Sequence, residues 1–293
     1  MPHDATNRFK EPTMPLPAEL LIIDAQNDFC DLPPSHRPLD PLTGQALEPA
    51  LPVPGAHADL QRLAGFIRAA GAGLTGITAT LDSHHRVDIA HPTFWVHGDG
   101  EAVAPFTEIT AAQVRSGAYR PRDAQVLPRA LAYLDELEAR GRYKLMVWPV
   151  HCEIGTWGHN LHADVQAACA AWEERTLQAV RYAIKGTNPW TEHYSALQAE
   201  VPDPQDPETG LNEPLLRHLD RDGALLIAGQ ASSHCVRATT EHLVQHMSRR
   251  RPEDIVLLSD CMSPVNGFAA QQQAFFDAMR ARGVQVARST ELL

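Results

Sequence analysis

The sequence predicts an α/β fold with three layers, in which helices cover both faces of a mainly parallel central sheet. Short apolar runs alternate with amphipathic segments along most of the 293 residues. This alternation is typical of buried parallel strands that are joined by crossover helices. Hydrophobic residues make up 44% and charged residues 21% of the chain, so its composition is that of a globular protein and not of a disordered one.

Each expected strand is a short apolar run, and each expected helix has apolar residues spaced three and four apart. The expected strands are residues 20–23, 74–80, 144–148, 180–184, 224–228, 255–259 and 284–287. The expected helices are residues 57–70, 128–140, 162–175, 211–221, 233–247 and 268–282, and Gly283 ends the last of them.

We expect a single domain over residues 1–293, enlarged by two insertions at about 86–127 and 188–214. The first insertion is rich in proline, glycine and histidine and lacks a clear period, and the second contains five prolines. Loops of this length in a compact domain usually cover a site or lie at an interface.

The charge and hydropathy of the chain argue against nucleic acids and membranes as partners. Thirty-six acidic against 25 basic residues give a formal net charge of −11, which disfavours binding to nucleic acids. The basic cluster at residues 249–251 is interpreted as the end of a helix, where cations offset the helix dipole. No apolar run is long enough to span a bilayer, and the N-terminal stretch has no secretory signal. We therefore expect a cytoplasmic protein that binds neither membranes nor nucleic acids and forms a homo-oligomer.

The chain has five scattered cysteines and no CxxC pair. This pattern argues against a disulfide framework and against a zinc site made of thiolates, and it suits a reducing compartment.

Reactive residue types follow the strands at the points where they end. Right-handed crossovers bring the carboxyl ends of parallel strands to one edge of the sheet, where ligands bind in open α/β folds. The segments that follow the strands are Asp24, Asp82-Ser83-His84, Trp148-Pro149-Val150-His151-Cys152, Lys185 and Gly229 to Cys235. Their convergence would place an acid, a metal cluster, a lysine and a cysteine together.

Cys235 is the candidate nucleophile. It lies in the first turn of an expected helix with Ser232 or Ser233 as the N-cap, where the helix dipole favours a thiolate. Lys185 could stabilise that charge and Asp24 could accept the thiol proton. The alternative is a buried structural cysteine beside an ordinary ion pair.

The second candidate is a metal site. Asp82 and His84 are two residues apart in an extended segment and point the same way, and His151 would supply a third ligand. One carboxylate and two imidazoles suit Zn²⁺, Fe²⁺ or Mn²⁺, and His85 or His91 could add another ligand. The alternative is a chance DxH among the 15 histidines of the chain.

The chain resembles the nicotinamidase (pyrazinamidase) group of the isochorismatase-like cysteine hydrolases over about two thirds of its length. The matching blocks occur in the family's order, which is more specific than any one block. They are Ile23 to Cys30, Asp82-Ser83-His84, Trp148 to Cys152 with Gly155-Thr156, Lys185-Gly186 and Ala231 to Val236.

The resemblance implies a role for each matching position. It implies a catalytic triad of Asp24, Lys185 and Cys235, and a divalent metal, most simply Zn²⁺, on Asp82, His84 and His151, with His91 as a further candidate ligand. The remaining implied positions are Phe29 and Trp148 around an aromatic substrate, Ala231 and Ser232 at the substrate, a cis peptide between them, and the N–H groups of Ala231 and Cys235 as the oxyanion hole. Tyr194 is a further candidate for substrate binding, with a solvated turn at 194–195 as the alternative.

Two departures from the family pattern concern the substrate. Gln230 replaces an aliphatic residue near the expected pocket and Ser232 replaces a threonine, while the first insertion would roof the site. We therefore expect a metal-containing cysteine amidohydrolase acting on a small aromatic amide such as nicotinamide. The alternatives are a relative that acts on another amide or an N-carbamoyl compound, and a non-catalytic binding protein. Isochorismate hydrolysis is disfavoured because that reaction does not require the cysteine.

Overall fold

The computed structural model describes residues 17–293, and it confirms the α/β fold class. The expectation that the N-terminal stretch carries no signal falls largely on residues 1–16, which lie outside the described residues. Within residues 17–293, no helix combines the length and the hydropathy needed to cross a bilayer.

A six-stranded parallel sheet forms the centre of the molecule, in the order β10-β9-β8-β1-β2-β7. Its strands are β1 (Ala18–Ile23), β2 (Leu74–Asp82), β7 (Arg181–Lys185), β8 (Ala224–Gly229), β9 (Ile255–Leu258) and β10 (Gln285–Ala287). Each of them begins and ends within about two residues of the expected position.

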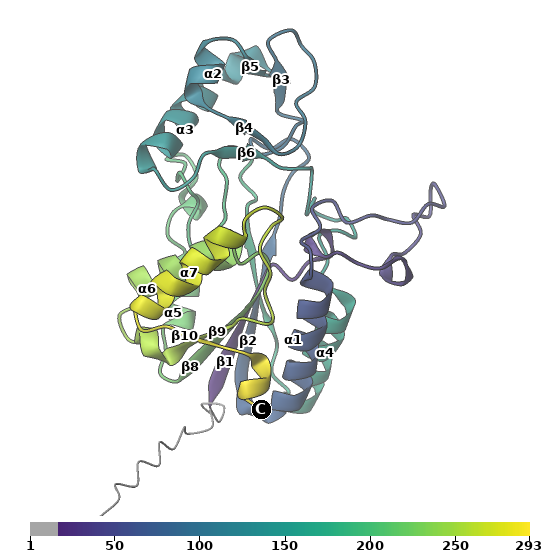
Figure 1. Ribbon diagram of the computed structural model, residues 1–293, viewed down its shortest axis with the longest axis vertical. Helices are drawn as coiled ribbons and strands as arrows, with labels where there is room; N and C mark the ends of the chain where they lie inside the picture. Colours follow the sequence, from purple (N-terminus) through teal and green to yellow (C-terminus); the bar gives the residue numbers. More distant parts are fainter. Residues whose placement is uncertain (1–16) are drawn as a thin grey trace, which may run out of the picture.

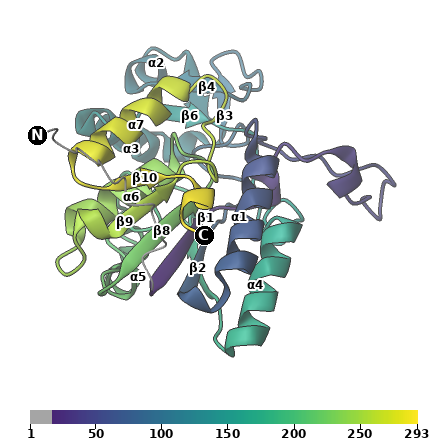
Figure 2. The same cartoon turned by 60° about the horizontal axis from the view of Figure 1, so that its bottom comes forward.

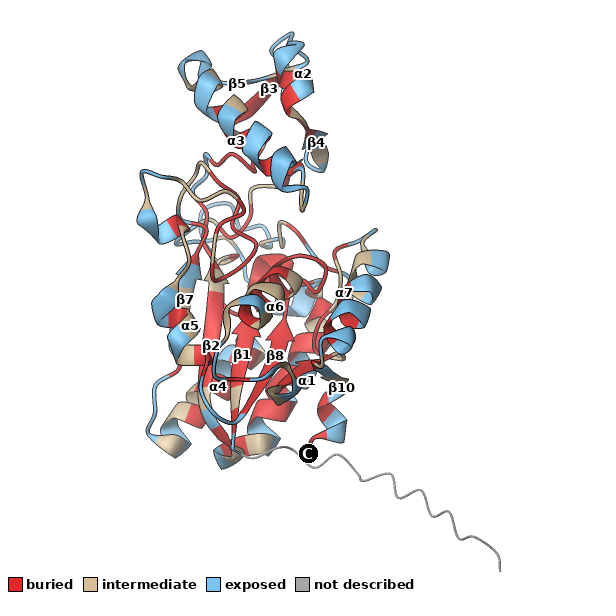
Figure 3. Ribbon diagram, turned by 90° about the vertical axis from the view of Figure 1, so that its left-hand side faces the viewer, coloured by how far each residue is buried: buried red, intermediate tan, exposed pale blue. Residues whose placement is uncertain are grey.

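Helices cover both faces of this sheet, as Figure 2 shows from below. One face carries α1 (Ala56–Ala70) and α4 (Ala163–Thr176), and the other carries α5 (Glu213–Leu219), α6 (Cys235–His246) and α7 (Ala269–Ala281). The reason is visible in β1, where Leu20 and Ile22 pack with the first layer, and Leu21 and Ile23 pack with the second. Successive side chains of a strand point to opposite faces, so a continuous apolar run requires cover on both (Figure 3).

The remaining elements form a second body above the carboxyl edge of the sheet, which we call the upper lobe (residues 94–147; Figure 1). Its elements are β3 (Trp95–His97), β4 (Thr107–Ile109), α2 (Ala111–Arg115), β5 (Tyr119–Pro121), α3 (Leu127–Arg140) and β6 (Leu145–Val147). The first insertion therefore contains regular structure, although its sequence shows no period.

The expected strand at 144–148 exists as β6, but it does not join the central sheet. It pairs antiparallel with β4 of the insertion, while β3 pairs with β5. Leu145 and Val147 are buried and Met146 between them is only half-buried, so β6 is a strand with one covered face. A short apolar run alone does not distinguish such a strand from a fully buried one.

The second insertion follows an irregular path, as its prolines predict. Within it the structure has one 3₁₀ turn, Pro207–Thr209, and the start of α5. Its residues from 191 to 200 are nonetheless almost all buried, because they pass beneath the upper lobe and over the sheet edge.

Arg250 corrects the interpretation of the basic cluster. Helix α6 ends at His246, and the Arg250 side chain is buried beyond it. Its guanidinium donates hydrogen bonds to the carbonyls of Leu219 and Gly223 and forms an ion pair with Glu19 at 3.0 Å. Arg250 thus fixes the loop before β8 to the start of β1, whereas Arg249 is exposed.

We predict that Arg250→Ala lowers the free energy of unfolding by about 3 kcal/mol, because it removes the donor to the Leu219 and Gly223 carbonyls and leaves Glu19 with Arg221 as its remaining ion-pair partner. Urea denaturation followed by circular dichroism measures the change. Arg249→Ala is the matched control and should change the free energy by less than about 0.5 kcal/mol. Equal effects of the two substitutions would contradict the assignment.

Candidate active site

Four adjacent segments deliver the candidate catalytic residues to the carboxyl edge of the sheet. Asp24 follows β1, Asp82 and Lys185 end β2 and β7, and Cys235 begins α6 shortly after β8. These strands are neighbours in the order β8-β1-β2-β7, and Asp82 lies directly opposite Lys185 in the ladder. The sheet register therefore brings together residues that are far apart in the sequence.

The ammonium group of Lys185 is the centre of this cluster. Its Nζ lies 2.7 Å from Asp82 Oδ1, 3.1 Å from Asp24 Oδ2 and 3.7 Å from Cys235 Sγ. It also donates to the backbone carbonyl of His193 at 2.9 Å. Burial disfavours the charge of Lys185, but the two carboxylates outweigh burial and hold its pKa well above the usual lysine value. Lys185 is therefore a permanent cation beside the thiol.

Asp24 is fully buried and faces both the lysine and the thiol. A carboxylate oxygen of Asp24 lies within 4.8 Å of both Cys235 Sγ and an oxygen of Asp82. The hydroxyl of Thr80 donates to Asp24 Oδ1 at 2.5 Å. Burial raises the pKa of Asp24 above its ordinary value, although Lys185 and Thr80 act in the opposite direction. A carboxylate with a raised pKa is a better proton acceptor.

Cys235 is the first residue of α6, but its environment differs from the expected one. The N-cap is His234 and not a serine, because the hydroxyl of Ser233 accepts a hydrogen bond from the N–H of Val265 instead. Burial raises the pKa of the Cys235 thiol well above its ordinary value, and the lowering by Lys185 does not offset it. Burial thus opposes the effect of the helix dipole, and a base such as Asp24 must accept the thiol proton.

Two backbone N–H groups are free to bind an oxyanion. Within residues 17–293, neither the Ala231 nor the Cys235 N–H has a hydrogen-bond acceptor. The cis peptide of this loop joins Gln230 to Ala231, one residue earlier than expected.

The side chains that flank Ala231 point away from the cavity at Cys235. The Ser232 hydroxyl accepts from Gln272 Nε2 at 2.8 Å, and its N–H donates to the Ser263 carbonyl. The Gln230 amide donates to Asp59 at 3.1 Å and accepts from the Ser263 N–H. Neither Gln230 nor Ser232 lines the cavity. The Ser232 hydroxyl is thus engaged by Gln272 of α7 and the Gln230 amide by Asp59 of α1, and a role of Ser232 in substrate binding stays a prediction.

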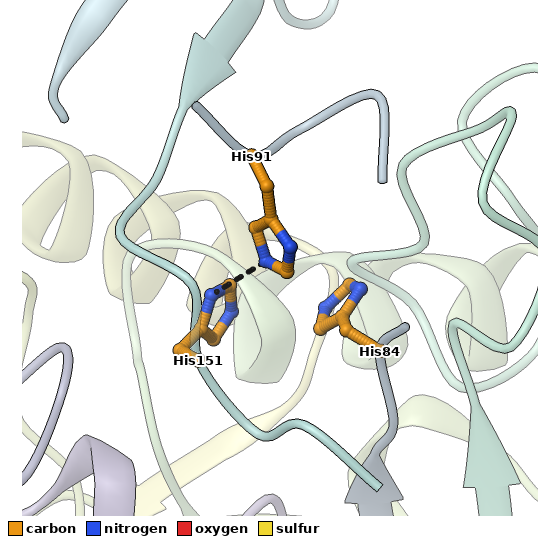
Figure 4. A group of neighbouring side chains, drawn as sticks. All are labelled: His84, His91 and His151. Carbon is orange, nitrogen blue, oxygen red and sulfur yellow. Dashed lines mark hydrogen bonds between the residues drawn. The ribbon is translucent and has the colours of Figure 1, made fainter. Parts of the chain in front are cut away.

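Three histidines, His84, His91 and His151, point toward one another (Figure 4), and Asp82 of the lysine cluster contacts two of them. One ring nitrogen from each of His84, His91 and His151 lies within 4.8 Å of the other two. Asp82 Oδ2 is 3.1 Å from His84 Nε2 and 3.5 Å from His151 Nε2, while its other oxygen binds Lys185. His91, the looser candidate in the sequence, lies as deep in the cluster as the others, whereas His85 is exposed and points elsewhere.

The donor set of this cluster fits a divalent transition metal. Imidazole and carboxylate are common ligands of Zn²⁺, Fe²⁺ and Mn²⁺. Burial and the neighbouring imidazoles lower the pKa of His91 to about 3, so its ring is neutral, which is the form that binds a metal. His91 Nδ1 is buried and has no partner within the described part of the chain. The buried Asp88 accepts from His84 Nδ1 at 3.1 Å and fixes the orientation of that ring.

A small cavity of about 20 Å³ lies beside Cys235 and His151, which both line it. Phe29 and Trp148 line it, as the resemblance implies, and Tyr194 lines it too. Tyr194 is buried, so the alternative of a solvated turn is wrong. Trp148 Nε1 donates to the Tyr194 hydroxyl oxygen at 3.1 Å. The hydroxyl proton of Tyr194 is not used in this bond and is available to donate to a ligand.

Two further polar residues that line the cavity, His234 and Glu192, were not predicted from the sequence. The His234 ring packs edge-on against Trp148, with ring centroids 5.2 Å apart. Burial raises the pKa of Glu192 to about 7, and its Oε2 is buried without a partner within residues 17–293. The adjacency of His234 to Cys235 was an available signal. Glu192 lies in the irregular second insertion, where no pattern indicates which side chains face inward.

Comparison with known proteins places this fold. No family profile and no curated protein matches the sequence. Solved structures do match, at a probability of 1.00. The yeast nicotinamidase Pnc1p has a TM-score of 0.60 at 20% identity, over 92% of this chain and 99% of that one. The protein PnC1 from L. infantum, solved in complex with nicotinate, has a TM-score of 0.56 at 18% identity, over 96% of this chain and 98% of that one.

The pyrazinamidase of Pyrococcus horikoshii, solved in complex with zinc, has a TM-score of 0.52 at 19% identity, over 93% of this chain and 99% of that one. The chain therefore has the fold of the nicotinamidases and pyrazinamidases along nearly its whole length. At these identities the likeness establishes the fold, and the chemistry must be argued from the residues.

We predict that the protein binds one equivalent of Zn²⁺ through the histidine cluster. His91→Ala and His151→Ala should each weaken the affinity about 100-fold, because each removes a buried ligand. Competition with a chromogenic zinc chelator measures the affinity. His85→Ala is the control, since His85 is exposed and adjacent to His84. Undiminished zinc binding by both cluster variants would contradict this assignment.

Proposed function

We propose that this protein is a metal-containing cysteine amidohydrolase that converts a small aromatic amide, of the nicotinamide type, to its carboxylate and ammonia. The observation that carries the proposal is the contact of Cys235 with Lys185 and Asp24 beside a four-residue metal-ligand set. The likeness to a yeast nicotinamidase that binds the inhibitor nicotinaldehyde supports the same substrate class.

The first half of the reaction is acylation of the thiol. Asp24 takes the proton from Cys235, and the charge of Lys185 stabilises the thiolate. The sulfur attacks the amide carbonyl, and the oxyanion is held by the Ala231 and Cys235 N–H groups. Each such donor is worth about 3 kcal/mol in comparable enzymes. Asp24 then returns the proton to the nitrogen, the C–N bond breaks and ammonia leaves.

The second half is hydrolysis of the thioester. Water attacks the acyl carbon, Asp24 accepts one of its protons, and the C–S bond breaks to give the carboxylic acid and the thiolate. Asp24 then returns that proton to the sulfur, and the released acid gives up its remaining proton to solvent. Asp24 is buried, and its carboxylate contacts Thr80 and Lys185 beside the reacting thiol, so it can act as the proton carrier in both halves.

The metal and the aromatic residues position the substrate. Asp82, His84, His91 and His151 would hold the ion, which supplies a Lewis-acidic point for a ring nitrogen or a bound water. Phe29 and Trp148 provide apolar ring surfaces, and the free Tyr194 proton and the Glu192 carboxyl provide polar contacts. Gln230, the departure from the family pattern that concerned the substrate, points away from the cavity. It therefore gives no reason to prefer a substrate other than an aromatic amide.

We predict that Cys235→Ala lowers ammonia release from nicotinamide at least about 1,000-fold, as removal of a nucleophile does in other hydrolases. Zinc content, measured by plasma mass spectrometry, should not change, because the sulfur is not part of the histidine cluster. Cys169→Ala, which alters a buried cysteine of α4, should retain activity. Normal turnover by the Cys235 variant would refute the mechanism.

The pH dependence of kcat/KM should follow the ionisation of Asp24. It must be ionised to act as the base and its pKa is raised, so kcat/KM should fall as the pH drops through a midpoint above that of an ordinary aspartate. Thr80→Val removes the hydrogen bond that favours the ionised form, so we predict that this acidic limb moves up by about 1 pH unit.

Thr78→Val is the matched control for that experiment, because Thr78 is a buried threonine on the same face of β2 and makes no hydrogen bond to Asp24. A pH–rate profile at saturating metal measures the shift. An unchanged limb in Thr80→Val, or an equal shift in both variants, would show that the limb belongs to another group.

A further inference from the structure

A second, polar cleft lies on the outer surface, at some remove from the cavity at Cys235. It has a volume of about 390 Å³ and is lined by residues of α3, α6 and α7 and by residues 198–200. We call it the Arg142 cleft, and the residues that matter in it are Arg140, Arg142, Glu200, His242, Gln245 and Arg282. It has no lining residue in common with the cavity at Cys235.

His242 lines this cleft and has a hydrogen-bond donor without an acceptor within the described residues. The Arg142 guanidinium lies 2.8 Å from His242 Nε2. A guanidinium has only donors, so Nε2 must accept. Burial lowers the pKa of His242 to about 4, which makes the ring neutral and places its single proton on Nδ1. That Nδ1 is buried and has no partner within the described part of the chain.

Glu200 provides a hydrogen-bond acceptor, in contrast to the donor of His242. Its side chain is almost fully buried, with 5% of the residue exposed. Its Oε2 is 3.6 Å from Arg142 Nη1, while Oε1 is buried and has no hydrogen-bond partner within residues 17–293. An unpartnered buried carboxylate oxygen is costly, and a cationic N–H donor would satisfy it.

The rim of the cleft carries a free positive charge. Arg140 is engaged through Nε with Glu136, and Arg142 is shared between Glu241 and Glu200. Arg282, directly after α7, is exposed and has no carboxylate within ion-pair distance among residues 17–293. A guanidinium in this situation favours a carboxylate ligand.

We propose that the Arg142 cleft binds a free α-amino acid, with its carboxylate on Arg282 and the His242 Nδ1–H and its ammonium group on Glu200. A simple anion would satisfy only the basic half of the cleft and would be repelled by Glu200. A metal ion would be repelled by the three arginines. A zwitterion of amino-acid size matches both halves, and a cleft of about 390 Å³ accommodates it.

The cleft is connected to the cavity by aromatic contacts. The Arg142 guanidinium lies over the Tyr143 ring at 5.3 Å, and Tyr143 packs on Tyr194 at 4.7 Å. Tyr194 lines the cavity at Cys235. An amino acid in the Arg142 cleft would therefore lie two aromatic rings from the candidate active site, yet its binding does not depend on the proposed hydrolysis.

The test is a thermal-shift panel of the standard L-α-amino acids at millimolar concentration, with acetate and methylammonium as single-charge controls. We expect at least one amino acid to raise the melting temperature, since a ligand that binds only the folded state stabilises it. Neither control should reproduce the shift. Isothermal titration calorimetry then gives the affinity of the amino acid that shifts most.

Glu200→Gln and Arg282→Gln should each weaken that affinity at least about tenfold. Arg280→Gln, an exposed arginine of α7 that is outside the cleft, should not. Arg282 is exposed, so its variant keeps the test valid if Glu200→Gln folds poorly. The proposal is overturned if no amino acid shifts the melting temperature, if acetate shifts it equally, or if the Arg282 variant binds as well as the parent.

Discussion

The candidate site depends on the pairing of one buried ammonium group with two buried carboxylates. Lys185 would not remain charged in the interior alone, and neither would Asp24 or Asp82, because an isolated buried ion is strongly disfavoured. Together they retain their charges and tie β7, β1, β2 and the start of α6 to one point. The same pairing decides the chemistry, since it provides both a base for the thiol and a cation for the thiolate.

Asp82 couples this cluster to the histidines. One of its oxygens binds Lys185 and the other faces His84 and His151. The thiol chemistry and the metal chemistry are therefore parts of one electrostatic unit. A change at Asp82 alters the charge balance on both sides, whereas a change at His91 or Cys235 affects mainly one side.

Much of this arrangement could be predicted from the sequence because parallel strands obey strict geometric rules. An apolar run that ends in a reactive residue places that residue at a known edge, and this applied to Asp24, Asp82, Lys185 and the loop before Cys235. The rule does not cover side chains whose direction depends on distant partners. Ser232 and Gln230 lie at the expected position, but Gln272 and Asp59, far away in the sequence, turn them from the cavity.

Local signals also failed where burial or an insertion outweighed them. The helix dipole favours a thiolate at Cys235, but full burial has the larger effect and opposes it. The run at 144–148 reads as a central strand, yet the insertion supplies β4 as its partner. Glu192 could not be found, since it lies in a segment whose prolines indicate only that it is irregular.

The position of the histidines has a mechanical consequence. Only two short connections attach the upper lobe to the body, residues 84–93 and 148–152, and the first carries His91 while the second carries His151. A single ion bound by both histidines would cross-link the two connections and attach the upper lobe to the end of β2. The ion would then restrict the movement of the upper lobe relative to the cavity at Cys235. Loss of the ion would increase that movement as well as remove a group that positions the substrate.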